Sequence, residues 1–205
     1  MNAAREPWMQ LPALPPALAL PMQELLAKVL GESRQRAIKQ LMAVGAAGRV
    51  GTSFVARHLA SQLAPAFGSV LLIEVRPEAP DQYSPVESPA ALALGGPVVV
   101  ITMPQSVCLG LNNHADGTLP ATLPADWLDA FGLVLWDVPA LTASPVAMVL
   151  AREVGGIVMV AQANRTRRHV ARHSALRLQE SGGRLLGVVL NRTLNFIPGW
   201  IYRLL

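Results

Sequence analysis

The sequence predicts an α/β fold with a mostly parallel β-sheet and helices on both faces. Along the 205 residues, short apolar runs typical of buried strands alternate with segments of helical spacing. The strand-like runs are continuously apolar, as parallel strands covered on both faces require. In the stretch 41–60, an apolar run leads into a glycine-rich turn and then into a helical segment. These three observations together predict one α/β domain.

The composition excludes some classes of function but does not identify one. The chain is 52% hydrophobic and 15% charged, which suits a well-filled α/β core. A net charge of +4 and a sequence pI near 10.0 permit contact with nucleic acid, anionic lipid or an acidic partner. The single cysteine, Cys108, excludes an intramolecular disulfide framework and a multi-cysteine metal site, and we expect it to be buried. No signal peptide or bilayer-length apolar run is visible, so we expect a cytoplasmic protein.

The elements follow in order from the amino end. Residues 1–21 are rich in proline and alanine, and we expect a flexible tail, with a tethering peptide as the alternative. Residues 22–205 then form a single domain, which opens with a short amphipathic helix at 22–31. Apolar runs predict strands at 40–44, 69–75, 97–103, 132–138, 155–163 and 184–192. Helical spacing predicts helices at 52–64, 125–131, 145–153 and 165–181, while 76–97 and 104–124 read mostly as loops.

The turn after the first strand has the form of a phosphate-binding loop (P-loop). In such a loop, backbone N–H groups and a helix N-terminus cradle phosphate, a lysine reaches the β- and γ-phosphates, and a Ser or Thr hydroxyl holds Mg²⁺. Thr52 stands at the lysine position, so the main charge is missing, while Ser53 stands at the Mg²⁺ position. Arg49 is a candidate substitute cation. The candidate nucleotide-binding residues here are Gly48, Arg49, Gly51, Thr52 and Ser53.

Two acids end predicted strands beside this loop. Asp137 closes the apolar run FGLVLWDV, the place where an acid contacts Mg²⁺ directly or through water, so Ser53 and Asp137 are the candidate Mg²⁺ ligands. The alternative is a carboxylate that caps the next turn or pairs with Arg49. Glu74 holds the comparable place on the neighbouring strand, where an ordinary strand-end acid is the alternative.

The helix predicted at 165–181 is strongly basic. A solvated face, an acidic partner or lipid surface, and nucleic acid are three open readings, and the lack of interleaved aromatic residues disfavours single-strand recognition. The chain end carries Trp200 and Tyr202, which either pack back on the domain or form an interface. The four histidines show no metal-ligand spacing. The candidate partner-binding residues are Arg165, Arg167, Arg168, Arg172, Trp200 and Tyr202.

Several segments together resemble one known family. They are VGAAGRVGTSFVARHLA, FGLVLWDVPAL, GGIVMVAQANRTRRHV and GRLLGVVLNRTLNFIPGWIYRLL. From about residue 22 to the end, the chain resembles the cytoplasmic domain of bacterial tyrosine kinases of exopolysaccharide systems, which are P-loop proteins of the MinD/ParA type. The resemblance implies a P-loop NTPase fold, ATP or ADP with Mg²⁺ as cofactors, and a nucleotide-binding role for Asn191. It also implies a membrane polysaccharide co-polymerase or a related kinase as partner, and leaves homo-oligomerisation open.

The departures from the family pattern predict impaired catalysis. The phosphate lysine is Thr52, the second acid of an LLIDAD-like strand end is Arg76, and Gly155 stands where the family usually has an aspartate. The C-terminal tyrosine cluster is absent, since Tyr83 and Tyr202 are the only tyrosines. We therefore expect an accessory or regulatory protein that docks at the inner membrane through its partner. The alternatives are an active atypical ATPase of the MinD/ParA type and a nucleic-acid-binding module.

Overall fold

The computed structural model describes residues 11, 13–77, 96–110, 123 and 125–192. The predicted partner-binding residues Trp200 and Tyr202 lie outside these ranges. Within the described chain, the strands are β1 Gln40–Gly45, β2 Val70–Arg76, β3 Val98–Pro104, β4 Leu133–Val138, β5 Gly156–Gln162 and β6 Leu185–Asn191. The sequence predicted each of them to within one residue at either end.

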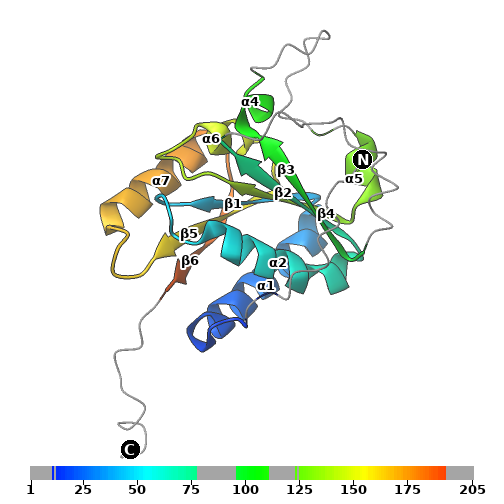
Figure 1. Cartoon of the computed structure of the whole chain (residues 1–205). Helices are drawn as coiled ribbons and strands as arrows, with labels where there is room; N and C mark the ends of the chain where they lie inside the picture. Colours follow the sequence, from blue (N-terminus) through cyan, green and yellow to red (C-terminus); the bar gives the residue numbers. More distant parts are fainter. Residues whose placement is uncertain (1–10, 12, 78–95, 111–122, 124, 193–205) are drawn as a thin grey trace, which may run out of the picture.

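The strands form a six-stranded parallel sheet in the order β3-β2-β4-β1-β5-β6 (Figure 1). Because all strands run in one direction, their carboxyl ends meet at one edge of the sheet. That edge carries Gly45, Glu74, Asp137 and Asn191. The predicted α/β class with a parallel sheet is therefore confirmed, and the candidate site residues gather where such sheets place their ligands.

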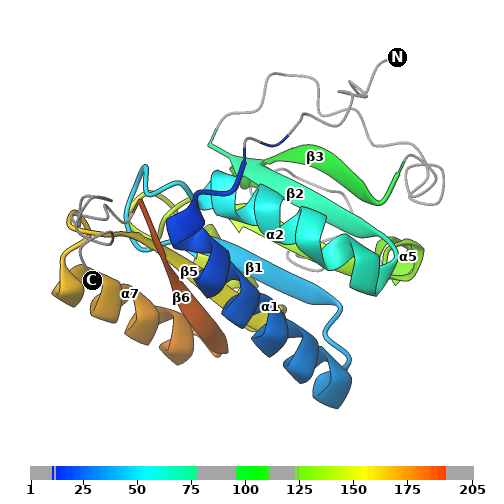
Figure 2. The same ribbon diagram turned by 90° about the horizontal axis from the view of Figure 1, so that it is seen from below.

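Helices cover both faces of the sheet (Figure 2). One face packs against α1 Pro16–Arg36 and α2 Thr52–Phe67. The other packs against α4 Gln105–Cys108, α5 Ala125–Ala130, α6 Val146–Leu150 and α7 Arg168–Glu180. Among the residues that the structure describes, no helix is both long enough and apolar enough to cross a bilayer.

The strands are buried on both sides, which explains their continuous apolar runs. In β1, Leu41 and Ala43 contribute to the core under α1 and α2, while Met42 and Val44 contribute to the core on the opposite face. Trp136 is fully buried, and its Nε1 donates a hydrogen bond to Oε1 of Gln40 at 3.0 Å. Cys108 is 1% exposed, as expected, and burial raises the pKa of its thiol to about 12.

The first helix begins earlier than the sequence predicted. α1 starts at Pro16 and ends at Arg36, so residues 16–21 are helical rather than part of an extended tail, and the predicted helix at 22–31 is only its centre. Proline is well placed at the first helical position, because that N–H has no intrahelical acceptor. Leu18 and Met22 are buried, and this packing outweighs the cost of Pro21 inside the helix. That residues 22–205 form one domain stays a prediction.

Candidate functional site

The P-loop backbone is formed by the end of β1, the turn at 46–51 and the start of α2. Gly51, the residue before the helix, has φ +87°, in the left-handed region that glycine adopts without strain. A Cβ at this position would also overlap the side-chain amide of Asn191. The N–H groups of Thr52, Ser53 and Phe54 donate to no other group of the described chain. The helix N-terminus therefore keeps the free donors that bind anions.

Two side chains from the second half of the chain hold this loop. Nδ2 of Asn191, at the end of β6, donates to the carbonyl oxygen of Val50 at 2.9 Å. The hydroxyl of Ser174, on α7, donates to the carbonyl oxygen of Ala46 at 3.2 Å. Both side chains are buried. The predicted nucleotide-binding residue Asn191 thus lies at the loop, where its amide fixes the loop backbone.

The lysine position of the loop carries no charge. The hydroxyl of Thr52 lies over Gly45, because a Cβ added to Gly45 would lie 2.8 Å from Thr52 Oγ1. Arg49 has φ +59° and is exposed, as is Gly48 beside it, and the structure records no contact of Arg49 with the other candidate residues. The loop therefore retains its backbone donors, but no lysine ammonium reaches a bound phosphate.

The two predicted strand-end acids are direct neighbours. In the parallel pairing of β2 with β4, Glu74 lies opposite Asp137. Their side chains are 5% and 3% exposed, and both face the start of α2. Burying two carboxylates side by side is costly unless cations or hydrogen bonds compensate them.

Two arginines compensate Glu74. Arg57 Nε, on α2, contacts Glu74 Oε1 at 2.7 Å, and Arg76 NH2, at the end of β2, contacts Glu74 Oε2 at 2.5 Å. Both carboxylate oxygens are therefore occupied. The Arg57 hydrogen bond and the Arg76 charge outweigh the effect of burial and hold the pKa of Glu74 below its usual value of 4.5.

The charge of the Asp137 carboxylate is compensated far less than that of Glu74. Its Oδ2 lies 3.8 Å from Arg76 NH1, beyond hydrogen-bond distance, and accepts no hydrogen bond within the described chain. Burial raises the pKa of Asp137 to about 6, against the lowering effects of the Ser53 hydroxyl and Arg76. Its environment favours the neutral carboxylic acid below that pH.

The residues predicted to hold Mg²⁺ come together but do not fit the ion. The ligand types of Ser53 and Asp137 suit Mg²⁺. However, Arg76 NH1 lies 3.4 Å from Ser53 Oγ and 3.8 Å from Asp137 Oδ2, so a guanidinium occupies the space that they share. The described residues contain no group of three or more His, Cys, Asp or Glu side chains suited to a metal. We therefore assign no step to a metal ion.

The basic helix α7 lies next to the P-loop through the Ser174 contact. Its N-terminal arginines and those of the preceding turn are exposed and form no ion pair with a described acid. These residues, hereafter the α7 arginines, are Arg165, Arg167, Arg168 and Arg172. The structure thus brings the predicted partner-binding arginines to the same edge of the sheet as the phosphate loop.

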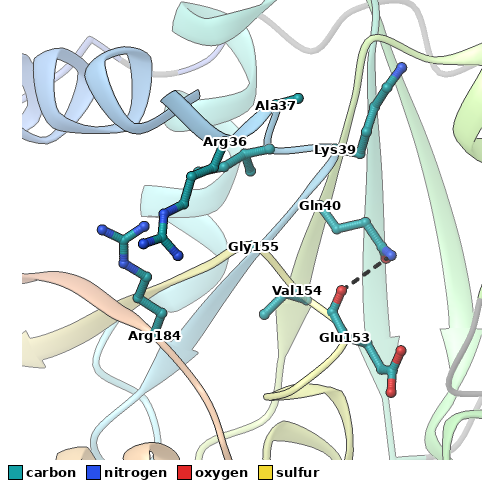
Figure 3. A pocket seen from close by; sticks show the side chains of 9 residues that line it. Arg36, Ala37, Lys39, Gln40, Glu153, Val154, Gly155 and Arg184 are labelled. Atoms are coloured by element: carbon teal, nitrogen blue, oxygen red, sulfur yellow. Dashed lines mark hydrogen bonds between the residues drawn. The ribbon is translucent and has the colours of Figure 1, made fainter. Parts of the chain in front are cut away.

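A separate pocket of about 410 Å³ lies at the opposite edge of the sheet (Figure 3). It is lined by the end of α1, the start of β1 and the segment before β5. Its cations are Arg36, Lys39 and Arg184, and Arg184 is paired with Glu32 at 2.7 Å. Because it lies at the amino ends of the strands, it takes no part in the predicted site.

The ion-pair cluster of Glu74, Arg57 and Arg76 was not predicted from the sequence. There, Arg76 stood out only as a departure from the family pattern, and Arg57 was not identified as a site residue. A signal was present, because Arg57 lies four residues after Ser53 and therefore on the same face of α2. Arg76 lies two residues after Glu74, which places both side chains on one face of β2.

Comparisons with known proteins establish the fold. The sequence matches no protein-family model and no curated protein. Among solved structures, the chimerical protein CapA2B2 is 19% identical with a TM-score of 0.63, over 83% of this chain and 84% of that one. The kinase domain of the Escherichia coli tyrosine kinase ETK is 20% identical with a TM-score of 0.61, over 89% and 81%. A ParA family ATPase from Chlorobium tepidum is 14% identical with a TM-score of 0.52, over 81% and 79%.

These identities are below the range in which structural likeness carries activity, so they support the architecture alone. The predicted P-loop architecture is confirmed by solved structures that match over most of the chain with TM-scores of 0.52 to 0.63. The chain has the α/β P-loop fold found in bacterial tyrosine-kinase domains and in ParA-type ATPases.

Proposed function

We propose that this chain is a catalytically impaired, tyrosine-kinase-like P-loop protein that acts as an accessory or regulatory subunit in bacterial exopolysaccharide synthesis or export. The observation that carries the proposal is Thr52 at the lysine position of an otherwise well-formed loop. Its hydroxyl lies over Gly45, inside the loop. A hydroxyl cannot neutralise the charge that develops on a transferring phosphoryl group, and positioning with charge stabilisation is most of what such catalysis requires.

The retained parts of the site support a residual role for phosphate contact. The free N–H groups of Thr52, Ser53 and Phe54 remain available to ATP or ADP. Losing a charge-assisted phosphate contact weakens binding by about 1.5–3 kcal/mol. Weak nucleotide binding without phosphoryl transfer is therefore the behaviour that we expect.

Tyrosine phosphorylation tests the catalytic part of the proposal. Purified protein incubated with Mg·ATP and a tyrosine-rich acceptor peptide is expected to produce no phosphotyrosine above the level of the Asp137→Ala variant. The variant is the matched control because it removes the acid that a working site would need beside the phosphates. Phosphotyrosine formation that Asp137→Ala abolishes would contradict the proposal and favour an active atypical enzyme.

The proposed mode of action is docking through the α7 arginines onto an acidic cytoplasmic segment of a membrane co-polymerase or a related kinase. These arginines are exposed and unpaired among the described residues, so they are available to a partner of opposite charge. Docking of this kind would hold the protein at the inner membrane through its partner.

Charge reversal tests the docking surface. The double variant Arg168→Glu/Arg172→Glu is expected to bind a fluorescent peptide that carries an acidic cytoplasmic segment of a polysaccharide co-polymerase at least about tenfold more weakly than wild type, as measured by fluorescence anisotropy. Lys28→Glu/Lys39→Glu, two exposed changes away from α7 that alter the net charge by the same amount, is the control and is expected to stay within about twofold of wild type. Equal losses in the two double variants would show that net charge, rather than this surface, governs binding.

A further inference from the structure

Besides lacking the catalytic lysine, the site carries a cation of its own, the guanidinium of Arg76, between the predicted metal ligands. Its guanidinium bridges three groups at the start of α2: NH2 contacts Glu74, while NH1 lies 3.4 Å from Ser53 Oγ and 3.8 Å from Asp137 Oδ2. Ser53 and Asp137 are the two residues whose types and positions suit a P-loop metal ion. A single side chain of this protein therefore lies where a bound cation would contact both.

The chemistry of arginine suits this place. A guanidinium keeps its charge at every physiological pH and offers several donors in a fixed plane, so it can face a hydroxyl and two carboxylates at once. Its position is also fixed locally, because Arg76 follows Glu74 by two residues on the same face of β2. The side chain is 38% exposed, so the guanidinium lies at the border between the buried acids and the phosphate side of the loop.

The second arginine adds a further cation beside Glu74. Arg57 Nε occupies the other oxygen of Glu74 at 2.7 Å, so neither Glu74 oxygen is free to coordinate. A divalent ion entering here would have Asp137 as its only unsaturated carboxylate and would face two guanidinium groups of like charge. Coulomb repulsion in a partly buried site disfavours that arrangement.

We propose that the guanidinium of Arg76 is a built-in cation that takes the place of Mg²⁺, so that the P-loop of this protein excludes divalent metal and meets phosphate ligands in metal-free form. The proposal rests on the proposed function in treating this as the same degenerate site. In addition to the loss of the lysine, the guanidinium of Arg76 occupies the position of the metal ion.

Metal binding in the absence of nucleotide tests this claim. Mn²⁺ is the probe, because its free and bound forms are distinguished by electron paramagnetic resonance and it takes oxygen ligands as Mg²⁺ does. Wild type is compared with Arg76→Ala, which vacates the position, and with Arg57→Ala. Arg57→Ala is the matched control, since it removes an equal charge from Glu74 while leaving Arg76 beside Ser53 and Asp137.

Arg76→Ala is expected to bind Mn²⁺ at least about tenfold more tightly than wild type, while Arg57→Ala stays within about twofold of it. Mg²⁺ should compete for the gained site, and Asp137→Asn in the Arg76→Ala background should abolish it. Tight Mn²⁺ binding by wild type, or an equal gain in both single variants, would overturn the proposal.

The melting temperature of wild type provides a test that needs no variant. It is expected to be unchanged by millimolar Mn²⁺ or Mg²⁺, because a protein that binds no metal gains no stability from it. A metal-dependent rise that saturates would overturn the proposal even if Arg76→Ala does not fold. Because no nucleotide is present, either result is independent of whether the protein transfers phosphate.

Discussion

The double variant Arg57→Ala/Arg76→Ala is expected to lose about 3–5 kcal/mol of unfolding free energy at pH 8. Glu74 is 5% exposed at its side chain and has a guanidinium on each oxygen. Removing both cations leaves a buried, ionised carboxylate without compensation, which is far more costly than the pairs themselves are worth. Urea unfolding measures the loss, and the melting temperature should fall by about 10 °C.

Three further variants, the two single arginine variants and a triple variant, distinguish the cost of the uncompensated Glu74 charge from the cost of lost packing. Each single arginine variant should lose much less than half of the double variant's loss, because one guanidinium still neutralises Glu74. Adding Glu74→Gln to the double variant should recover most of the stability. If the triple variant is as unstable as the double, the arginine stems contribute by packing and the charge argument is wrong.

The ion pairs of Glu74 with Arg57 and Arg76 also predict that the stability of the protein depends on pH in the acid range. The folded-state pKa of Glu74 lies below 4.5, so the stability from its arginines is present above that value and is lost as pH falls through the folded pKa. The deficit of the double variant relative to wild type should therefore shrink as the pH is lowered below about 4.5.

Asp137→Asn is expected to stabilise the protein at pH 7.5, by up to about 3 kcal/mol. The pKa of Asp137 is raised from 3.8 to about 6 by burial. A raised acid pKa contributes stability that is fully present below 3.8 and is lost as pH rises through about 6, because the folded state must then hold an ionised buried carboxylate. Asparagine has a similar shape and never ionises, so the variant avoids that cost.

The pH profile of this difference is its test. Chemical unfolding of wild type and Asp137→Asn at several values between pH 4 and 8 should give stabilities that diverge as pH rises from 3.8 to about 6 and then differ by a constant amount. Below about pH 4 the gain should vanish, because Asp137 is then protonated in the folded protein as well. A variant that is less stable by the same amount at every pH would show that Asp137 acts through hydrogen bonds, not as a costly charge.

The parts of the molecule that the sequence predicted are those fixed by local pattern. The strands are continuous apolar runs bounded by turn residues, so their positions follow from burial on both faces. The P-loop could also be predicted, because its glycines, the preceding strand and the following helix are contiguous in the chain. The meeting of Glu74 and Asp137 followed from their place at the carboxyl ends of parallel strands.

The parts that could not be predicted depend on tertiary packing. The start of α1 at Pro16 is decided by the burial of Leu18 and Met22, which overrides the poor helix propensity of a proline-rich segment. The contacts of Arg76 depend on the direction that its long side chain takes, because the same residue could equally have faced solvent. The contacts of Arg76 with Glu74 and Ser53 depend on the surrounding cluster, which includes Arg57 and Asp137, and only the folded structure shows that cluster.

The rate of phosphate release from Mg·ATP tests most directly whether this P-loop has lost its catalytic chemistry. Wild type and Asp137→Ala are purified in the same way and measured side by side at the same Mg²⁺ concentration. We expect indistinguishable rates of phosphate release for the two, both at the level of the protein-free blank. A wild-type rate about tenfold or more above that of Asp137→Ala would contradict it, because an acid-dependent rate requires a working phosphoryl-transfer site.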